Sequence, residues 1–141
     1  MVGTIDMKTM RYINLFSQIC KVSTKYCFDY NNSIIFVVPL SDVTRAIGSG
    51  ARNVKLLSSK MGRKVRVLGL PNEANSTTVS KFVSSLVEPV TFTKLELKEK
   101  SIVITGGRQA RASLIGRNRI REEELLKLLK GVFGIKNLRF G

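Results

Sequence analysis

Residues 43–67 read VTRAIGSGARNVKLLSSKMGRKVRV, and this segment contains seven basic side chains and no acidic one. Its apolar spacing predicts a short helix, a turn at Gly48–Ala51, a second helix and a strand. Because glycine has no Cβ atom, a turn of this kind can bring backbone N–H groups close to a phosphate. The basic side chains add an attraction to any polyanion, whatever its sequence. Residues 43–67 therefore predict the working part of an RNA-binding domain.

The whole chain carries an excess of positive charge. Its 141 residues include 24 basic and 10 acidic side chains, which gives a net charge of +14. Residues 1–72 carry 11 basic and 3 acidic side chains, and residues 73–141 carry 13 and 7, so the excess is not confined to a tail. This balance indicates nucleic acid or another anionic surface as the partner. The length suits one domain or two very small ones.

The composition also argues against several classes of function. The chain has no histidine, and its two cysteines, Cys20 and Cys27, do not have zinc-site spacing. We therefore expect no metal and no cofactor. The chain has no imidazole base, and its carboxylates are few and scattered apart from Glu122–Glu124 at a predicted helix start, so we expect no enzymatic activity and no small-molecule substrate. No secretory signal is visible and no apolar run approaches the ~20 residues of a membrane-spanning helix, so we expect a cytoplasmic protein with no membrane partner.

Two consecutive segments share one predicted order of elements, helix-strand-strand-helix-helix-strand. For residues 1–70 the hydrophobic pattern predicts elements at 6–20, 25–30, 33–39, a short helix ending at 47, 50–61 and 64–68. For residues 71–141 it predicts elements at 77–87, 90–97, 101–105, 108–115, 120–132 and 135–140. Residues 69–76 have the composition of a linker. The repeat of the order indicates an internal duplication.

With these elements in place, the phrase Arg-Ala-Ile-Gly-Ser-Gly-Ala-Arg-Asn-Val at residues 45–54 resembles the loop of a K homology (KH) domain. The order of the elements resembles that of type II KH domains. Two tandem copies and the opening helix around Met10–Phe16 resemble the short archaeal NusA-like transcription elongation and termination factors. The resemblance implies an α+β fold of two tandem type II KH domains, residues 1–70 and 71–141. In each of them, helices would pack on a three-stranded mixed sheet.

The resemblance also implies a function. It implies binding of single-stranded RNA, the nascent transcript, with RNA polymerase as a second partner, in transcription elongation, termination or antitermination. KH domains hold about four nucleotides against a GXXG loop, with the bases in an apolar groove. In this chain the loop would be Gly48–Ala51, and the groove would be lined by Ile47, Val54, Leu57 and Val67. The candidate RNA-binding residues of the first unit are Ile47, Gly48, Ser49, Gly50, Ala51, Arg52, Asn53, Lys55, Arg63 and Lys64.

Two positions around the first loop carry specific expectations. Ala51 stands where the GXXG pattern has its last glycine. Because Ala51 begins a predicted helix, we expect it to have helical backbone angles and to be free of strain. Asn53 lies on the first turn of the same helix, where its amide is expected to reach a phosphate or a base.

The second unit departs further from the pattern. Its loop, Gly116-Arg117-Asn118-Arg119, has a single glycine, which makes close backbone approach less favourable. The glutamates 122–124 complement the dipole of the following helix, but they also place negative charge where a phosphate would lie. Nearby arginines offset this charge. We expect a degenerate loop on a backbone-contacting surface, with the candidate residues Arg108, Arg111, Gly116, Arg117, Asn118 and Arg119.

Other interpretations stay open at this point. The chain would also suit a KH-type RNA binder in ribosome assembly or RNA processing. From another class, it would suit a basic interaction scaffold that docks on acidic polymerase or ribosomal surfaces. Gly48 and Gly50 would then only separate two helices.

Overall fold

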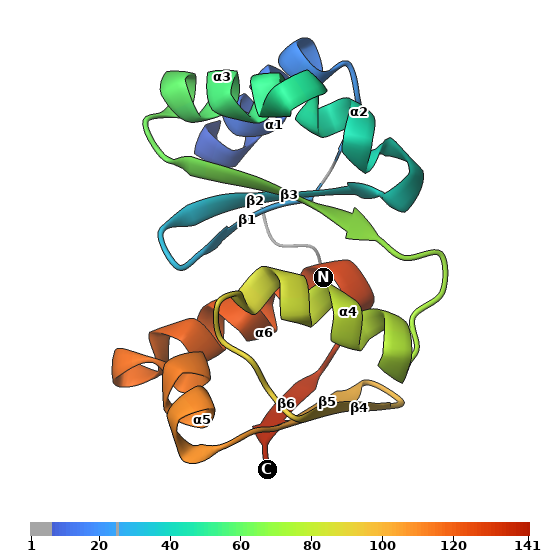
Figure 1. The fold of residues 1–141 in the computed structure, drawn as a ribbon, viewed down its shortest axis with the longest axis vertical. Helices are drawn as coiled ribbons and strands as arrows, with labels where there is room; N and C mark the ends of the chain where they lie inside the picture. Colours follow the sequence, from blue (N-terminus) through green and yellow to red (C-terminus); the bar gives the residue numbers. More distant parts are fainter. Residues whose placement is uncertain (1–6, 25) are drawn as a thin grey trace. The chain divides into compact units, whose positions relative to one another are not determined.

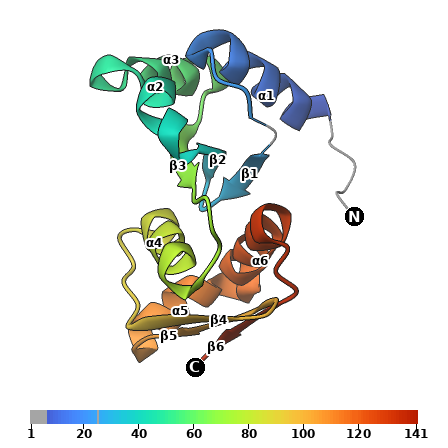
Figure 2. The same cartoon turned by 90° about the vertical axis from the view of Figure 1, so that its right-hand side faces the viewer.

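The chain folds into two compact units that divide between Leu70 and Pro71. The computed structural model describes residues 7–24 and 26–141. Each unit combines helices with one small mixed three-stranded sheet (Figures 1 and 2), so the predicted α+β class is confirmed. Asp6 and Lys25, predicted to begin the first helix and the first strand, lie outside the described residues.

The first unit follows the predicted order of elements. It contains α1 (Met7–Cys20), β1 (Tyr26–Tyr30), β2 (Ser33–Pro39), α2 (Val43–Ile47), α3 (Arg52–Met61) and β3 (Lys64–Leu70). The short 3-10 turns η1 (Leu40–Asp42) and η2 (Ser49–Ala51) precede α2 and α3. Strand β2 is central, antiparallel to β1 and parallel to β3. The predicted strand at 64–68 was too short, because Gly69 and Leu70 still pair with Val38 and Pro39.

Helices α1, α2 and α3 cover one face of this sheet (Figure 1). Successive residues of a strand point to opposite faces, and on β2 the alternate residues Ile34, Phe36 and Val38 join the helices in one core cluster. Phe16 of α1 stacks on Phe36 with ring centroids 4.4 Å apart. Such a pair contributes about 0.5–1.5 kcal/mol beyond its buried area. This packing fixes α2 and α3, and therefore the turn between them, against the sheet.

The second unit repeats the arrangement. It contains α4 (Ser76–Val87), β4 (Lys94–Lys98), β5 (Ser101–Thr105), α5 (Arg108–Ile115), α6 (Ile120–Phe133) and β6 (Asn137–Phe140), with the 3-10 turn η3 (Arg117–Arg119) before α6. Strand β5 is antiparallel to β4 and parallel to β6. The two sheets also share a register, since Ser33 pairs with Lys64 in one and Ser101 with Asn137 in the other.

Two local details of the second unit differ from the prediction. The strand predicted at 90–97 is shorter, because regular pairing begins only at Lys94. Helix α4 begins earlier than predicted because Asn75 caps it: the Asn75 side chain accepts from the Thr78 N–H at 2.9 Å, and Thr78 Oγ1 accepts from the Asn75 N–H at 3.0 Å. None of the helices formed by the described residues is both long and apolar enough to cross a bilayer.

Candidate nucleic-acid interface

The turn at Gly48–Ala51 joins two successive helices of the first unit, α2 and α3. The Gly48 N–H donates to the Thr44 carbonyl at 3.0 Å, which ends α2, and the Ala51 N–H donates to the Gly48 carbonyl at 3.1 Å. The first N–H groups of a helix have no partner within it. The amides of Ser49 and Gly50 are in this position, and both residues are exposed. The turn therefore presents two backbone donors where an anion can approach.

Gly48 has a conformation that requires glycine. Its φ of 81° and ψ of 167° lie in a region that is open essentially to glycine alone. A Cβ atom at this position would also lie 3.0 Å from Cγ of Asn53. The predicted importance of Gly48 therefore has a local cause in its backbone angles and its contact with Asn53.

The expectation for Ala51 was wrong. Ala51 has φ 61° and ψ 28°, which is the left-handed region, and Gly50 beside it has φ 61° and ψ 27°. An L-residue in this region costs roughly 1–2 kcal/mol because its Cβ crowds the following carbonyl oxygen. The helix begins only at Arg52. The turn thus holds two consecutive left-handed residues, one of them strained.

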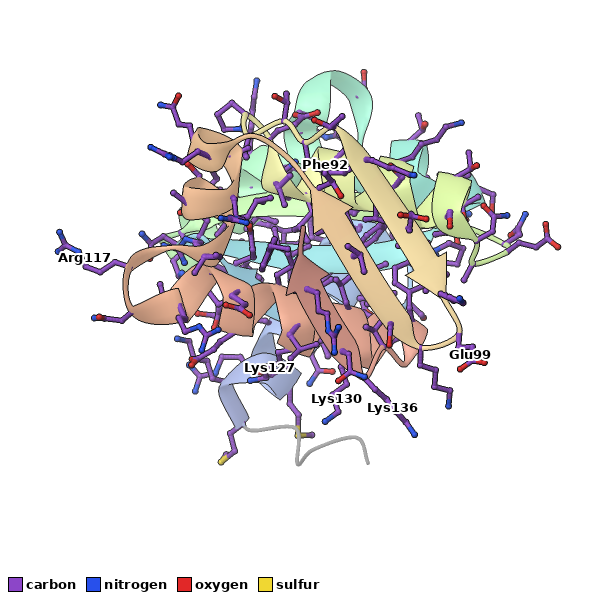
Figure 3. The ribbon with its side chains drawn as sticks, turned by 90° about the horizontal axis from the view of Figure 1, so that it is seen from below. Phe92, Glu99, Arg117, Lys127, Lys130 and Lys136 are labelled. Carbon is purple, nitrogen blue, oxygen red and sulfur yellow. The ribbon has the colours of Figure 1, made fainter. Side chains whose placement is uncertain are left out.

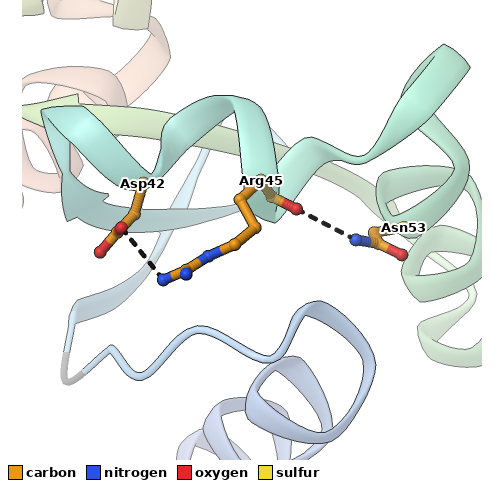
Figure 4. A network of polar contacts seen from close by, with 3 residues as sticks. All are labelled: Asp42, Arg45 and Asn53. Atoms are coloured by element: carbon orange, nitrogen blue, oxygen red, sulfur yellow. Dashed lines mark hydrogen bonds and ion pairs between the residues drawn. The ribbon is translucent and has the colours of Figure 1, made fainter.

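Polar contacts connect the two helices on either side of the turn (Figure 4). Asn53 Nδ2 donates to the carbonyl oxygen of Arg45 at 3.3 Å, and Arg45 Nη2 donates to Asp42 Oδ1 at 3.1 Å. One amide hydrogen of Asn53 thus holds the end of α2, and the expected contact of this amide with a phosphate or a base stays a prediction. Asp42 immediately precedes α2, but its side chain makes no capping hydrogen bond and pairs with Arg45.

The basic residues nearest the turn lie on one side of α3. Arg52 and Lys55 are exposed and three residues apart, so they are neighbours on the helix surface. The predicted groove needs a correction, because Leu57 has no exposed surface and belongs to the core. Val54 and Val67 pack partly against that core, and Ile47 is half-buried.

Sequence reasoning missed the apolar surface at the start of α2. Leu40 is 60% exposed, and a Cβ on Gly69 of β3 would lie 2.5 Å from its Cδ1 and 3.0 Å from Cγ2 of Val43. Leu40, Val43 and Gly69 thus form a close apolar contact between α2 and the edge strand β3. Assigning Gly69 to a linker hid this contact. A glycine inside a strand pattern is the signal that could have revealed it.

Arg63 and Lys64 do not lie at the turn. They follow the far end of α3, whose ten residues span roughly 15 Å. Arg63 Nη1 donates to Asp29 Oδ1 at 2.8 Å, and its side chain is 26% exposed. Burial acts to lower the pKa of Arg63, but hydrogen bonds and charge interactions with Asp29 and Tyr12 outweigh burial and raise the pKa above its ordinary value. Arg63 therefore ties α1 and β1 to the start of β3.

The loop of the second unit has the same backbone as the first. Gly116 has φ 76° and ψ 173°, Asn118 has φ 56° and ψ 27°, and Arg119 has φ 62° and ψ 21°. Asparagine enters the left-handed region more readily than most residues, which replaces the second glycine. Residues 117–119 are exposed, and Figure 3 shows Arg117 extending away from the loop. Arg108 and Arg111 lie exposed on α5, toward its start.

No cation-binding arrangement accompanies either loop. Within residues 7–24 and 26–141, no three His, Cys, Asp or Glu side chains come together in a way that would hold a metal ion.

Comparison with known proteins gives one distant relative and a shared fold. No family model matches the chain. The chain is 28% identical over 122 residues to a Methanocaldococcus jannaschii protein named "Probable transcription termination protein NusA". This match covers 84% of the chain, but the chain spans only 64% of the relative's length. A crystal structure of the protein APE1850 has a TM-score of 0.63 and 23% identity over 97% of this chain and 100% of that one, which shows a common fold.

Proposed function

We propose that this protein binds single-stranded RNA through the Gly48–Ala51 loop. The backbone of this loop carries the proposal: Gly48 makes a turn that only glycine adopts, and the Ser49 and Gly50 amides follow it without a helical partner. Arg52 and Lys55 add positive charge beside these donors. A phosphate would receive backbone hydrogen bonds from the turn and electrostatic attraction from α3.

The two units are, in this proposal, tandem type II KH domains at residues 1–70 and 71–141. The order of the elements, the mixed sheets and the loops with matching backbone angles all support this reading. KH domains take unpaired strands, because their bases must be splayed into a groove. In the first unit, Ile47 and the apolar contact of Leu40, Val43 and Gly69 would line that groove.

The distant relative extends the proposal to transcription. Its name supports a role in transcription termination, and the resemblance seen in the sequence extends the proposal to elongation and antitermination. In this role the chain binds the nascent transcript in the cytoplasm beside RNA polymerase. The chain would act by binding and would catalyse no reaction.

A loop variant tests RNA binding directly. Ser49→Asp together with Gly50→Asp places two carboxylates beside the amide donors, and aspartate tolerates the left-handed angles of position 50. We expect an unchanged circular dichroism spectrum and a loss of about tenfold or more in affinity for an unstructured ten-nucleotide RNA, since charge repulsion replaces charge-assisted contacts. Equal binding by wild type and variant would contradict the loop mechanism.

The corresponding substitutions in the second loop are Arg117→Asp with Asn118→Asp, for which we expect a smaller loss although they remove one more positive charge. A larger loss of RNA affinity in this variant would mean that the second unit provides the main RNA-binding loop. For the role in transcription, the chain is added to elongation complexes of an archaeal polymerase, with and without ribonuclease treatment. If the chain stays bound to the complexes only while the exposed transcript is intact, the proposal is supported. If the chain stays bound after ribonuclease treatment, the scaffold alternative is supported.

A further inference from the structure

The two loops share a backbone but differ in the side chains that follow them. Gly48, Gly50 and Ala51 match Gly116, Asn118 and Arg119 in φ to within a few degrees. The number of glycines therefore does not decide the backbone conformation of the loop in this chain, and by itself it does not distinguish a loop that binds phosphate from one that does not. Any difference in anion binding between the units must come from side chains around the loops.

Those side chains have opposite charge. After the first loop, residues 52–56 read Arg-Asn-Val-Lys-Leu, and at the same positions after the second loop, residues 120–124 read Ile-Arg-Glu-Glu-Glu. Val54, Lys55 and Leu56 are thus replaced by three glutamates near the start of α6, with Glu122 and Glu123 on its first turn. The first loop is therefore followed by two basic side chains and no acidic one, whereas the second is followed by one arginine and three glutamates.

The glutamates engage the arginines of their own loop. Arg119 Nε donates to Glu122 Oε1 at 3.2 Å, and Arg121 Nη1 donates to Glu124 Oε1. Arg119, Glu122, Glu123 and Leu126 line a shallow hollow beside the loop. Arg119 and Arg121 are therefore each already paired with a glutamate within the unit.

The Arg119–Glu122 pair is not needed to hold the fold. The Arg119 side chain is 75% exposed, and an ion pair this open to solvent adds little stability. The backbone of the loop is held by Gly116, where an added Cβ would lie 2.7 Å from Cγ of Arg121. Glu122–Glu124 also suit the positive end of α6, which is a structural role that the test must separate from an effect on binding.

We propose that Glu122, Glu123 and Glu124 keep the second loop from binding phosphate. Removing their charge would turn this loop into a second RNA-binding loop. This proposal takes its ligand from the proposed function. The glutamates compete with a phosphate for Arg119 and Arg121 and repel it from the amides of Arg117 and Asn118. The first loop then remains as the main contact with the strand.

The test uses the full chain with the first loop disabled by Ser49→Asp and Gly50→Asp. Into this background we introduce Glu122→Gln, Glu123→Gln and Glu124→Gln, and measure binding of a ten-nucleotide oligouridylate at one fixed salt concentration. We expect affinity to rise about tenfold, as for a gained charge-assisted phosphate contact. No rise would overturn the proposal.

Two controls separate a local effect from a general one. Glu73→Gln, Glu96→Gln and Glu99→Gln change the net charge equally at exposed positions outside α6, and we expect a rise of less than about twofold. Adding Arg117→Asp and Asn118→Asp to the α6 variant should abolish its gain. An equal rise from the control glutamates, or a gain that survives these loop substitutions, would overturn the proposal.

The test of the glutamates does not depend on whether the first loop binds RNA. If the unmodified chain fails to bind the oligonucleotide, the proposed function fails, whereas a gain from the α6 variant would still support the inhibitory role of the glutamates. Urea unfolding of each variant accompanies the binding data. A purely structural role of the glutamates would change unfolding without any gain in binding.

Discussion

The side-chain amide of Asn53 occupies the space in which a Cβ atom on Gly48 would lie, with Cγ and Nδ2 of Asn53 each 3.0 Å from that position. The same Nδ2 donates to the carbonyl oxygen of Arg45. One side chain thus packs on the first residue of the loop and holds the end of the preceding helix. A larger residue at position 48 would therefore press on the side chain that connects α3 to the end of α2.

Gly48→Ala should destabilise the chain strongly. The substitution combines strained backbone angles with a contact on Asn53, and we expect the free energy of unfolding to fall by about 2–3 kcal/mol. The matched control is Gly62→Ala, because Gly62 also has positive φ (67°) but nothing lies within 4 Å of its added Cβ. There we expect a loss of about 1 kcal/mol. Urea unfolding measures both, and equal losses would contradict the role given to Asn53.

Ala51→Gly should stabilise the chain, although glycine usually weakens a protein near a helix. Relief of left-handed strain exceeds the added entropy of the unfolded chain, so we expect a gain of about 0.5–1 kcal/mol. Ala112→Gly, at an exposed helical position of α5, should instead cost about 1 kcal/mol. Thermal unfolding of the two variants gives the comparison. A loss at position 51 would mean that its backbone is unstrained.

Alanine substitutions of Arg63 and Arg52 should have different effects, the first on the stability of the fold and the second on the affinity for RNA. Arg63→Ala removes the ion pair with Asp29, and we expect a loss of about 1 kcal/mol in stability with RNA affinity changed less than about twofold. Arg52→Ala should leave unfolding unchanged and weaken RNA binding, with the salt slope reduced by about one phosphate contact. Fluorescence anisotropy at several salt concentrations measures this. A binding loss in the Arg63 variant equal to that of the Arg52 variant would place Arg63 at the RNA.

Cys20 should make the stability of the chain sensitive to alkaline pH. Burial raises the pKa of the Cys20 thiol from 9.0 to about 11, so the fold favours the protonated form. The resulting contribution to stability is complete below pH 9.0 and is lost as the pH rises through about 11. A shift of this size corresponds to about 2–3 kcal/mol.

Urea unfolding across this pH range, compared with Cys20→Ala, isolates the effect of the thiol from that of lysine titration. The curve for the Cys20→Ala variant should be flatter between these pH values. The same slope in both proteins would show that Cys20 does not resist ionisation.

Much of the fold could be predicted because its signals are local. The β-branched run at 33–39 and the helix at 108–115 match β2 and α5 in their bounds, since periodicity and flanking turn residues are read within a few positions. The limits of β4 were misjudged because Val90–Thr93 alternate like a strand but make no regular pairs. Propensity cannot show whether a partner strand is present.

By itself, the sequence determined the order of the elements, their duplication, the excess of positive charge and the need for glycine at position 48. Tertiary structure alone decided the partner of Arg63, because the Arg63–Asp29 pair joins positions 34 residues apart. It also decided that Ala51 and Arg119 take left-handed angles and that the two loops match in shape. The packing of α2 on α3 and of α5 on α6 sets those angles, and neighbouring residues in the chain do not encode such packing.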